Sequence, residues 1–272
     1  MLLQLDHFNH GWITPALSYL MSVIGSVLGL RCAFHARTAR WPGGWLIAAA
    51  VALGGAGIWV MHFTAMLGFA IVGVTIHYDM TITLLSAAIA ILVVWVGLSI
   101  VVRWRREIFA LPIGGAVTGL GVAAMHYLGM YGMRSTAMVH YRPGLVALSI
   151  VIAVAASTVA LWFVLHLRGF AATIGAALIM GVAVCGMHYT GMAAMNAQHG
   201  HHDSVPGGSD PMQLLTPLIV IVTLVTMMLI VLVGLAEIDS AERGSTGRAR
   251  PVVDPELAAS GRQWPRQDIS RH

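Results

Sequence analysis

Residues 170–195 read FAATIGAALIMGVAVCGMHYTGMAAM, an apolar run without Asp, Glu, Lys or Arg. At about 1.5 Å of rise per residue, a helix of this length crosses the hydrocarbon core of a bilayer, which is about 30 Å thick. Six further apolar runs of similar character lie at approximately 13–30, 45–72, 81–102, 108–130, 145–165 and 214–235. The sequence therefore predicts an all-α membrane protein, folded as a bundle of seven transmembrane helices.

The composition of the whole chain agrees with a lipid environment. Of the 272 residues, 58% are hydrophobic and only 10% are charged, and the mean hydropathy is +0.80. A water-soluble domain carries about a quarter of charged residues. The net charge of +4 is small, and no basic cluster of the kind that binds nucleic acid stands out, so we expect no nucleic-acid partner.

The arginines predict the orientation of the bundle. They collect in alternate connections, near residues 37–40, 103–106 and 168, and again in the C-terminal segment. The connections on the other side hold only Arg134 and Arg142. Because positive residues concentrate on the cytoplasmic side, we expect the N-terminus outside, the C-terminus in the cytoplasm and the chain in the cytoplasmic (inner) membrane, with many passes through it.

Two segments of different character divide the chain. Residues 1–236 form the predicted membrane domain, and residues 237–272 are rich in Arg, Ser, Gly and Pro. The second segment is too short and too polar for a core of its own, so we expect a disordered cytoplasmic tail. Neither segment shows paired carboxylates or a nucleophile beside a base, so the sequence does not indicate an enzyme.

A box of six residues occurs three times. It reads MHFTAM at 61–66, MHYLGM at 125–130 and MHYTGM at 187–192. The three histidines are 64 and 62 residues apart, and a glycine stands seven residues before each: Gly55, Gly119 and Gly181. Met and His are uncommon residues, so this spacing indicates an internal repeat of helix pairs rather than chance.

Each box lies at the same depth in its predicted helix. Each box histidine follows a residue at or next to the start of its run by 17 residues: His62 follows Trp45, His126 follows Phe109 and His188 follows Ala171. That is about 25 Å of helix, which lies in the outer third of a core about 30 Å thick. The three imidazoles are therefore predicted to lie in one layer near the outer face.

The residue types around this layer predict a metal site. A methionine follows each histidine by one helical turn and shares its face, and Cys185 precedes His188 by three residues. Imidazole, thioether and thiolate ligands together favour copper, Cu(I) above all, whereas zinc would leave the methionines unexplained. The predicted metal ligands are His62, His126, His188, Met66, Met130, Met192 and Cys185.

Packing alone offers a simpler interpretation of several of these residues. A histidine in a membrane helix can bond to a neighbouring carbonyl, although ionisable residues there usually mark function. Methionine and glycine are common packing residues in such helices. We interpret the box aromatics Phe63, Tyr127 and Tyr189 as an interfacial belt. The histidine-rich loop 199–202 fits metal capture and a solvated loop equally well.

The three boxes resemble the motif of the MHYT family, a bacterial integral membrane sensor domain. Met187-His188-Tyr189-Thr190 matches the motif directly, and the boxes at 61–66 and 125–130 resemble variants of it. The resemblance covers about residues 7–236. It implies a seven-helix bundle of paired repeats that binds copper near the outer face and, through it, senses oxygen, carbon monoxide or nitric oxide.

Many members of that family carry a cytoplasmic output domain, whereas this sequence ends after a short polar segment. The resemblance therefore implies that a separate cytoplasmic signalling protein receives any signal. Two other functions stay open from the sequence: a copper transporter or chaperone-like membrane protein, and a haem-binding membrane protein, since histidines of facing helices can ligate haem. The lipid bilayer is the one partner common to all three.

Overall fold

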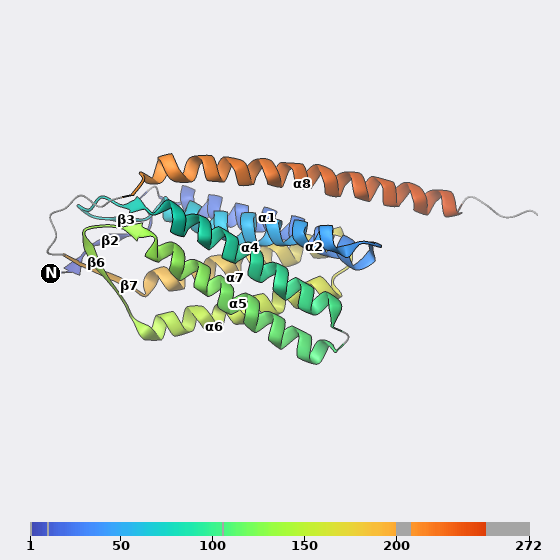
Figure 1. Cartoon of the computed structure of the whole chain (residues 1–272), viewed down its shortest axis with the longest axis horizontal. Coiled ribbons are helices and arrows are strands. Elements are labelled where there is room, and N and C mark those ends of the chain that lie inside the picture. The colour runs from blue at the N-terminus through green and yellow to red at the C-terminus, as the bar shows by residue number, and fades with distance from the viewer. Residues whose placement is uncertain (1, 10, 105, 200–207, 249–272) are drawn as a thin grey trace, which may run out of the picture. The chain divides into compact units, whose positions relative to one another are not determined.

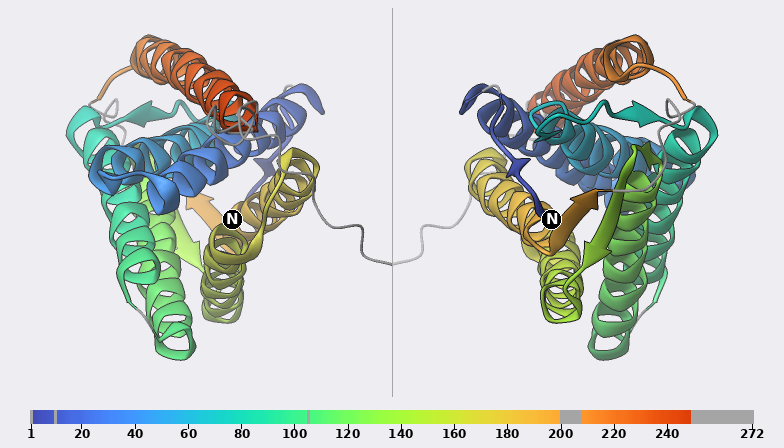
Figure 2. Two further views of the ribbon diagram at one scale, coloured as in Figure 1. Left: turned by 90° about the vertical axis from the view of Figure 1, so that its right-hand side faces the viewer. Right: turned by 90° about the vertical axis from the view of Figure 1, so that its left-hand side faces the viewer.

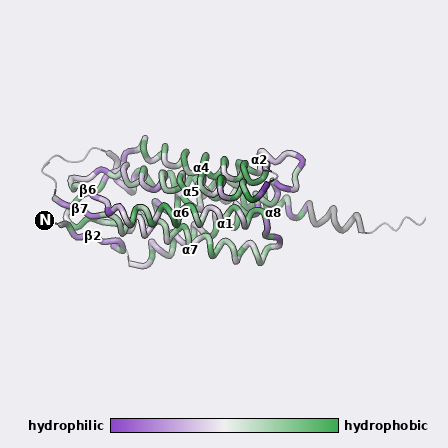
Figure 3. Tube along the Cα trace, turned by 90° about the horizontal axis from the view of Figure 1, so that it is seen from below, coloured by the Kyte–Doolittle hydropathy of each residue, from purple (hydrophilic) through white to green (hydrophobic). Residues whose placement is uncertain are grey.

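The computed structural model describes residues 2–9, 11–104, 106–199 and 208–248, and within them seven helices are long and apolar enough to cross a membrane (Figure 1). They are α1 (Ile13–Thr38), the continuous segment α2 (Pro42–Ala50), η1 (Val51–Val60) and α3 (Met61–Met66), then α4 (Met80–Arg103), α5 (Glu107–Tyr131), α6 (Pro143–His166), α7 (Phe170–Ala193) and α8 (Pro211–Arg248). Hydrophobic residues follow the middle of the helices (Figure 3). The predicted all-α membrane fold is confirmed.

The helix ends follow local chemistry. Asp79 caps α4, its carboxylate accepting the backbone N–H of Ile82 at 3.1 Å, and prolines open α2 and α6 at positions where no backbone donor is lost. Helix α1 runs eight residues past its predicted end at residue 30. Arginine is compatible with a helix, and the Arg37 guanidinium at this end donates to the carbonyl of Leu165 at 2.6 Å.

Six of the spans form a closed ring, which we call the six-helix ring. The three spans that carry the boxes (α2–η1–α3, α5 and α7) alternate with three that do not. Helix α4 packs between η1 and α5, α6 packs between α5 and α7, and α1 packs between α7 and η1 (Figure 2). Sequence order makes α8 the partner of α7 in the third helix pair, yet α1 occupies that place in the ring.

Helix α8 lies along the outside of the six-helix ring as far as Val233 (Figures 1 and 2). Its buried residues, among them Leu215, Leu229 and Val233, recur along one face. The chain from Gly234 onward is a separate unit. Residues 237–248, expected in the disordered tail, are helical as the continuation of α8. Ala, Glu and Arg at 241–243 favour a helix, whereas the Gly-Ser-Thr-Gly stretch at 244–247 does not. Residues 249–272 lie outside the described part.

Short strands gather at one end of the bundle, which we call the strand end (Figure 1). They are β1 (Leu2–Leu3), β2 (Leu5–Asp6), β3 (Ala70–Ile71), β4 (His77–Tyr78), β5 (Met133–Arg134), β6 (Ala137–Tyr141) and β7 (Met195–His199). All pairs are antiparallel, in the order β1-β7-β6, β2-β3 and β4-β5. Strands of two to five residues are too short to show a period, so the sequence predicted only loops here.

The span that carries the first box contains a π-helix, η1, of ten residues. This span is the most enclosed of the seven: 78% of its central window is buried, against 17% to 44% in the others. Glycines allow the close approach, since a Cβ on Gly54 would lie 2.6 Å from the carbonyl oxygen of Ala90 in α4. The Trp59 indole donates to the Ser86 hydroxyl at 3.0 Å and fixes η1 against α4.

Candidate metal centre

The three box histidines meet at the centre of the six-helix ring. Nδ1 of His62, in α3, lies 3.0 Å from Nδ1 of His188, in α7. It lies 3.2 Å from Nδ1 of His126, in α5. Each of the three side chains is 1% exposed. The prediction that they share a layer is therefore confirmed.

Equal positions along the three helices produce this layer. The histidines lie four residues before the last residue of α3 and five before the last residues of α5 and α7. Their rings are arranged edge to face, with centroids 5.0, 5.0 and 5.1 Å apart. We call these three side chains the three-histidine layer.

Two glycines make room for the imidazoles, a role that the sequence analysis missed. A Cβ on Gly129 would lie 2.5 Å from Nε2 of His62, and a Cβ on Gly191 would overlap the ring of His126. Each glycine stands three residues after the histidine of its own box and accommodates the histidine of another box. The first box has Ala65 at this position. The recurrence of glycine in two of three boxes was the available signal.

The nitrogens of this layer have the chemistry of a cation site. With the protons on Nε2, three Nδ1 lone pairs converge, and neutral imidazoles cannot satisfy one another in that arrangement. Nitrogens about 2.0–2.1 Å from a tetrahedral metal lie about 3.4 Å apart, within a few tenths of an ångström of the separations seen here. Nε2 of His62 and of His126 are buried without a hydrogen-bond partner, which is rare for buried polar atoms. The residues fit a metal ion.

In the part of the chain that the structure describes, these histidines form the only cluster of three or more His, Cys, Asp or Glu residues with ligand atoms within 4.8 Å of one another. Cys185 is half-buried and does not belong to the cluster. Met66, Met130 and Met192 are buried, 2% to 3% exposed, one turn beyond the histidines. Met133 and Met195, which a continuous helix would place on the same face, lie instead in strands.

A sequence profile described as "Bacterial signalling protein N terminal repeat", named MHYT, matches residues 55–113, 119–177 and 181–245. The chain belongs to the MHYT family. Each matched segment begins at the glycine that stands seven residues before a box histidine and includes the helix that follows the box. The predicted repeat of helix pairs is thus the repeat of the family, and the chain is a membrane domain of signalling proteins.

Curated relatives carry the MHYT region within longer chains. The bifunctional diguanylate cyclase/cyclic di-GMP phosphodiesterase MucR of Pseudomonas aeruginosa is 34% identical over 240 residues, which are 84% of this chain and 34% of MucR. The cyclic di-GMP phosphodiesterase NbdA of the same species is 37% identical over 186 residues, 66% of this chain and 22% of NbdA. The signalling protein YkoW of Bacillus subtilis is 35% identical over 178 residues, 61% of this chain and 21% of YkoW.

This MHYT chain therefore spans about a third of MucR and about a fifth of the other two relatives. No solved structure matches it.

The box aromatics of this MHYT chain support the three-histidine layer. Phe63 is 0% exposed and meets the His62 ring edge to face at 4.7 Å, so its interpretation as an interfacial residue is wrong. The Tyr127 hydroxyl lies 2.6 Å from the Ser149 hydroxyl and joins α5 to α6. Each box aromatic meets the ring of the histidine before it edge to face, and Tyr127 in addition links its helix to a neighbour.

The N-terminal segment covers the strand end of the MHYT bundle next to the layer. Its β2 pairs with β3, and the Asn9 backbone N–H donates to the Gly68 carbonyl at 2.9 Å. Between these points the His7 ring packs on Phe69, with centroids 5.4 Å apart, and burial lowers the pKa of His7. Of the histidine-rich loop, His199 ends β7, and residues 200–202 lie outside the described part.

Proposed function

We propose that this MHYT chain is a metal-dependent sensor of the bacterial cytoplasmic membrane, with its strand end facing outward and a copper ion in the three-histidine layer. The observation that carries the proposal is the convergence of three buried Nδ1 atoms, one from each repeat, at 3.0 and 3.2 Å. The methionines one turn beyond, Met66, Met130 and Met192, are the further ligand candidates.

The donor set favours copper over harder metals. Among the described residues no carboxylate joins the cluster, and buried thioethers next to imidazoles suit Cu(I) better than zinc, calcium or magnesium. When bound, copper would supply a redox-active centre with affinity for oxygen, carbon monoxide or nitric oxide. The chain itself would hold the ion, keep water away through Phe63 and its neighbours, and link the centre to three helices at once.

The three helices give such a centre a route to the cytoplasmic side. A change in the separation of the imidazoles acts on α3, α5 and α7. Through α5 and α7 it reaches the end of the bundle where these two helices begin, which we call the arginine-rich end because Arg103, Arg106 and Arg168 lie there. Sensing requires two arrangements of these helices with different affinity for the ligand. We propose that a cytoplasmic signalling protein or domain reads them, in line with the signalling relatives, and that the membrane domain itself senses rather than catalyses.

The geometry supports a sensor over the two other functions. Haem would need its macrocycle between two axial nitrogens, and separations of 3.0 and 3.2 Å leave no space for it. A copper transporter would need polar ligands on both sides of the layer. On the side toward the arginine-rich end, the described residues that line the adjoining cavity are almost all apolar, which disfavours passage of an ion.

Metal analysis with optical and X-ray absorption spectroscopy of the purified chain tests the proposal. We expect about one copper per chain and nitrogen scattering from imidazoles, with affinity lowered at least about tenfold in His126→Ala and His188→Ala. His140→Ala, in an exposed part of β6, is the matched control and should bind as the wild type does. Loss of sulfur scattering in Met66→Leu or Met192→Leu would identify thioether ligands.

A chain that stays free of copper after reconstitution would overturn the proposal. So would unchanged binding in a variant that lacks all three box histidines.

A further inference from the structure

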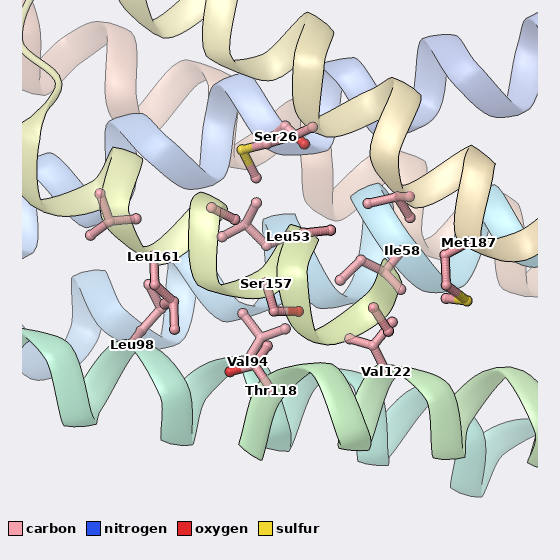
Figure 4. Close-up of a pocket in the computed structure, with 16 residues that line it drawn as sticks. Ser26, Leu53, Ile58, Val94, Leu98, Thr118, Val122, Ser157, Leu161 and Met187 are labelled. Carbon is pink, nitrogen blue, oxygen red and sulfur yellow. The ribbon is translucent and has the colours of Figure 1, made fainter. Parts of the chain in front are cut away.

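An apolar cavity lies on the axis of the six-helix ring and receives residues from all six spans (Figure 4). It offers about 60 Å³ to the centre of a water-sized molecule. One residue from each span illustrates its lining: Ser26 of α1, Leu53 of η1, Val94 of α4, Val122 of α5, Leu161 of α6 and Met187 of α7. The cavity is therefore a central feature of the fold rather than a surface groove.

The cavity begins directly beneath the three-histidine layer. Ile58, Val122 and Val184 all line it, and each stands four residues before a box histidine, one helical turn or about 6 Å away. Figure 4 shows Ile58, Val122 and Met187 at one end of the cavity and Leu161 at the other. Met187, which also lines it, is the residue next to His188 in the chain.

The cavity continues from there toward the arginine-rich end. Its lining on α6 runs from Ala153 to Val164, which is about 16 Å of helix. It therefore connects the histidine layer with the deeper interior of the membrane domain.

The lining has few groups that can form hydrogen bonds with water. Of its sixteen residues, thirteen are Ala, Val, Leu, Ile or Met, and the rest carry hydroxyls: Ser26, Thr118 and Ser157. The Thr118 hydroxyl is directed at the carbonyl of Val93, at 3.5 Å. A buried water needs two to four polar partners, whereas dry apolar cavities take up xenon and small apolar molecules. The chemistry of this cavity thus selects a small ligand without charge or hydrogen-bonding groups.

We propose that the cavity binds an apolar diatomic molecule of the dioxygen class and presents it to the three-histidine layer from the side of the membrane interior. The N-terminal segment covers the opposite side of the layer at the strand end. Apolar gases dissolve in the bilayer core, so the ligand is available at this depth. The role of the cavity in sensing rests on the proposed metal centre, whereas its affinity for an apolar ligand does not.

Xenon is the probe for the cavity itself, used on the 272-residue chain in detergent without metal. We expect xenon to shift the methyl NMR signals of Met187 and Val122. Ala153→Leu fills the cavity and should weaken this binding at least about tenfold, as expected when a ligand's space is occupied. Ala155→Leu adds the same side chain to an exposed position of α6 and should leave it unchanged.

If Ala153→Leu fails to fold, Ala156→Leu, at another lining position of α6, replaces it. Xenon shifts that are absent from the wild type, or that persist when the cavity is filled, would overturn the proposal. Contacts from detergent or lipid chains to Met187 would also overturn it, since the cavity would then hold an acyl chain.

Copper-loaded protein separates the two proposals. Ala153→Leu should keep the copper content of the wild type and slow the rebinding of carbon monoxide after photolysis several-fold, whereas Ala155→Leu should not. His188→Ala should lose copper and keep xenon. If the chain binds xenon but does not bind copper, the proposal of a metal centre is wrong and the proposal of a cavity site is retained. Copper binding without xenon binding would overturn the cavity site alone.

Discussion

The first Met-His box shares its histidine and both of its methionines with the two later ones, and differs from them in its surroundings. Box 61–66 follows a π-helix and belongs to the most enclosed span, with 78% of its central window buried. Boxes 125–130 and 187–192 end uniform α-helices that are 44% and 33% buried. Gly129 and Gly191 accommodate neighbouring imidazoles, and the first box has Ala65 there. The repeat thus fixes the three nitrogens in equivalent places without making their helices equivalent.

The repeat glycines should reveal the difference most strongly. A Cβ on Gly119 would overlap the backbone of Val154 in α6, so Gly119→Ala must push α5 and α6 apart, and we expect a loss of about 2–3 kcal/mol. The equivalent Cβ on Gly55 has its nearest neighbour, Ile91 Cδ1, at 3.9 Å. Gly55→Ala should therefore be neutral or stabilise by up to about 1 kcal/mol, because alanine favours helices.

Gly181→Ala should fall between these two, since its new methyl would meet side chains that can move, Tyr19 and Val23, at 2.9 Å. Thermal unfolding of the three variants in one detergent measures the order of their stability losses. Equal losses from Gly55→Ala and Gly119→Ala would show that the three repeats are equivalent after all.

The glycines of the boxes test the same comparison at the metal centre. Gly129→Ala and Gly191→Ala would displace the rings of His62 and His126, and we expect copper affinity to fall about tenfold or more, as when the orientation of a metal-bound histidine is disturbed. Ala65→Gly only removes a methyl and should change affinity little. Competition with a copper chelator measures all three, and an effect confined to Ala65→Gly would contradict the proposed seating of the rings.

A smaller effect is expected where the connections after the first two boxes meet. Strands β4 and β5 pair there, and Arg134 forms an ion pair with Asp79 at 3.1 Å. The pKa of Asp79 lies below its ordinary value of 3.8. The largest cause is the hydrogen bond from the backbone N–H of Ile82, and the next is the hydrogen bond from Arg134. A carboxyl with a lowered pKa stabilises the folded state above its unfolded pKa, and this stabilisation is lost as the pH falls through the folded pKa.

Hydrogen exchange around Tyr78 and Met133 should therefore accelerate only below about pH 4, where Asp79 takes up a proton. His77 stands opposite Arg134 in the pairing and is another titratable group nearby. Asp79→Asn should exchange faster already at pH 6 and lose the acid dependence. An acid transition that persists in Asp79→Asn would assign the effect to another group.

The sequence predicted those features that depend on the polarity of a segment and on the helical periodicity of its residues. Seven apolar runs gave seven spans, and equal depth in three helices gave the histidine layer. Cys185 shows the limit of reasoning about helix faces. Positions −3 and +4 are turned to the same side of the histidine, by about 60° and about 40°, but position −3 lies about 4.5 Å back along the helix axis. The structure leaves the cysteine outside the cluster.

Other features depend on contacts that no single segment encodes. The π-helix arises in a run of small residues that fits several helical forms, and the strands are too short for a pattern. Helix α1 lacks a box, and α8 follows α7 directly, so sequence order alone favours α8 as a member of the six-helix ring. The lower mean hydropathy of α1, 1.6 against 3.1 for α8, was the available signal. The cavity likewise results from side chains of six spans and has no signature in any one of them.

The place of α1 between η1 and α7 also has a consequence for biogenesis. Helix α1 is synthesised before the other spans of the ring, but α7, one of its two neighbours there, is made only after four intervening spans. The face of α1 that finally packs against α7 therefore contacts lipid while the intervening helices insert. Closure of the ring is then the step with the largest separation along the chain, and contacts of that kind form slowly. A histidine layer that needs α3, α5 and α7 together is thus completed only once α7, the sixth of the seven described spans, has inserted.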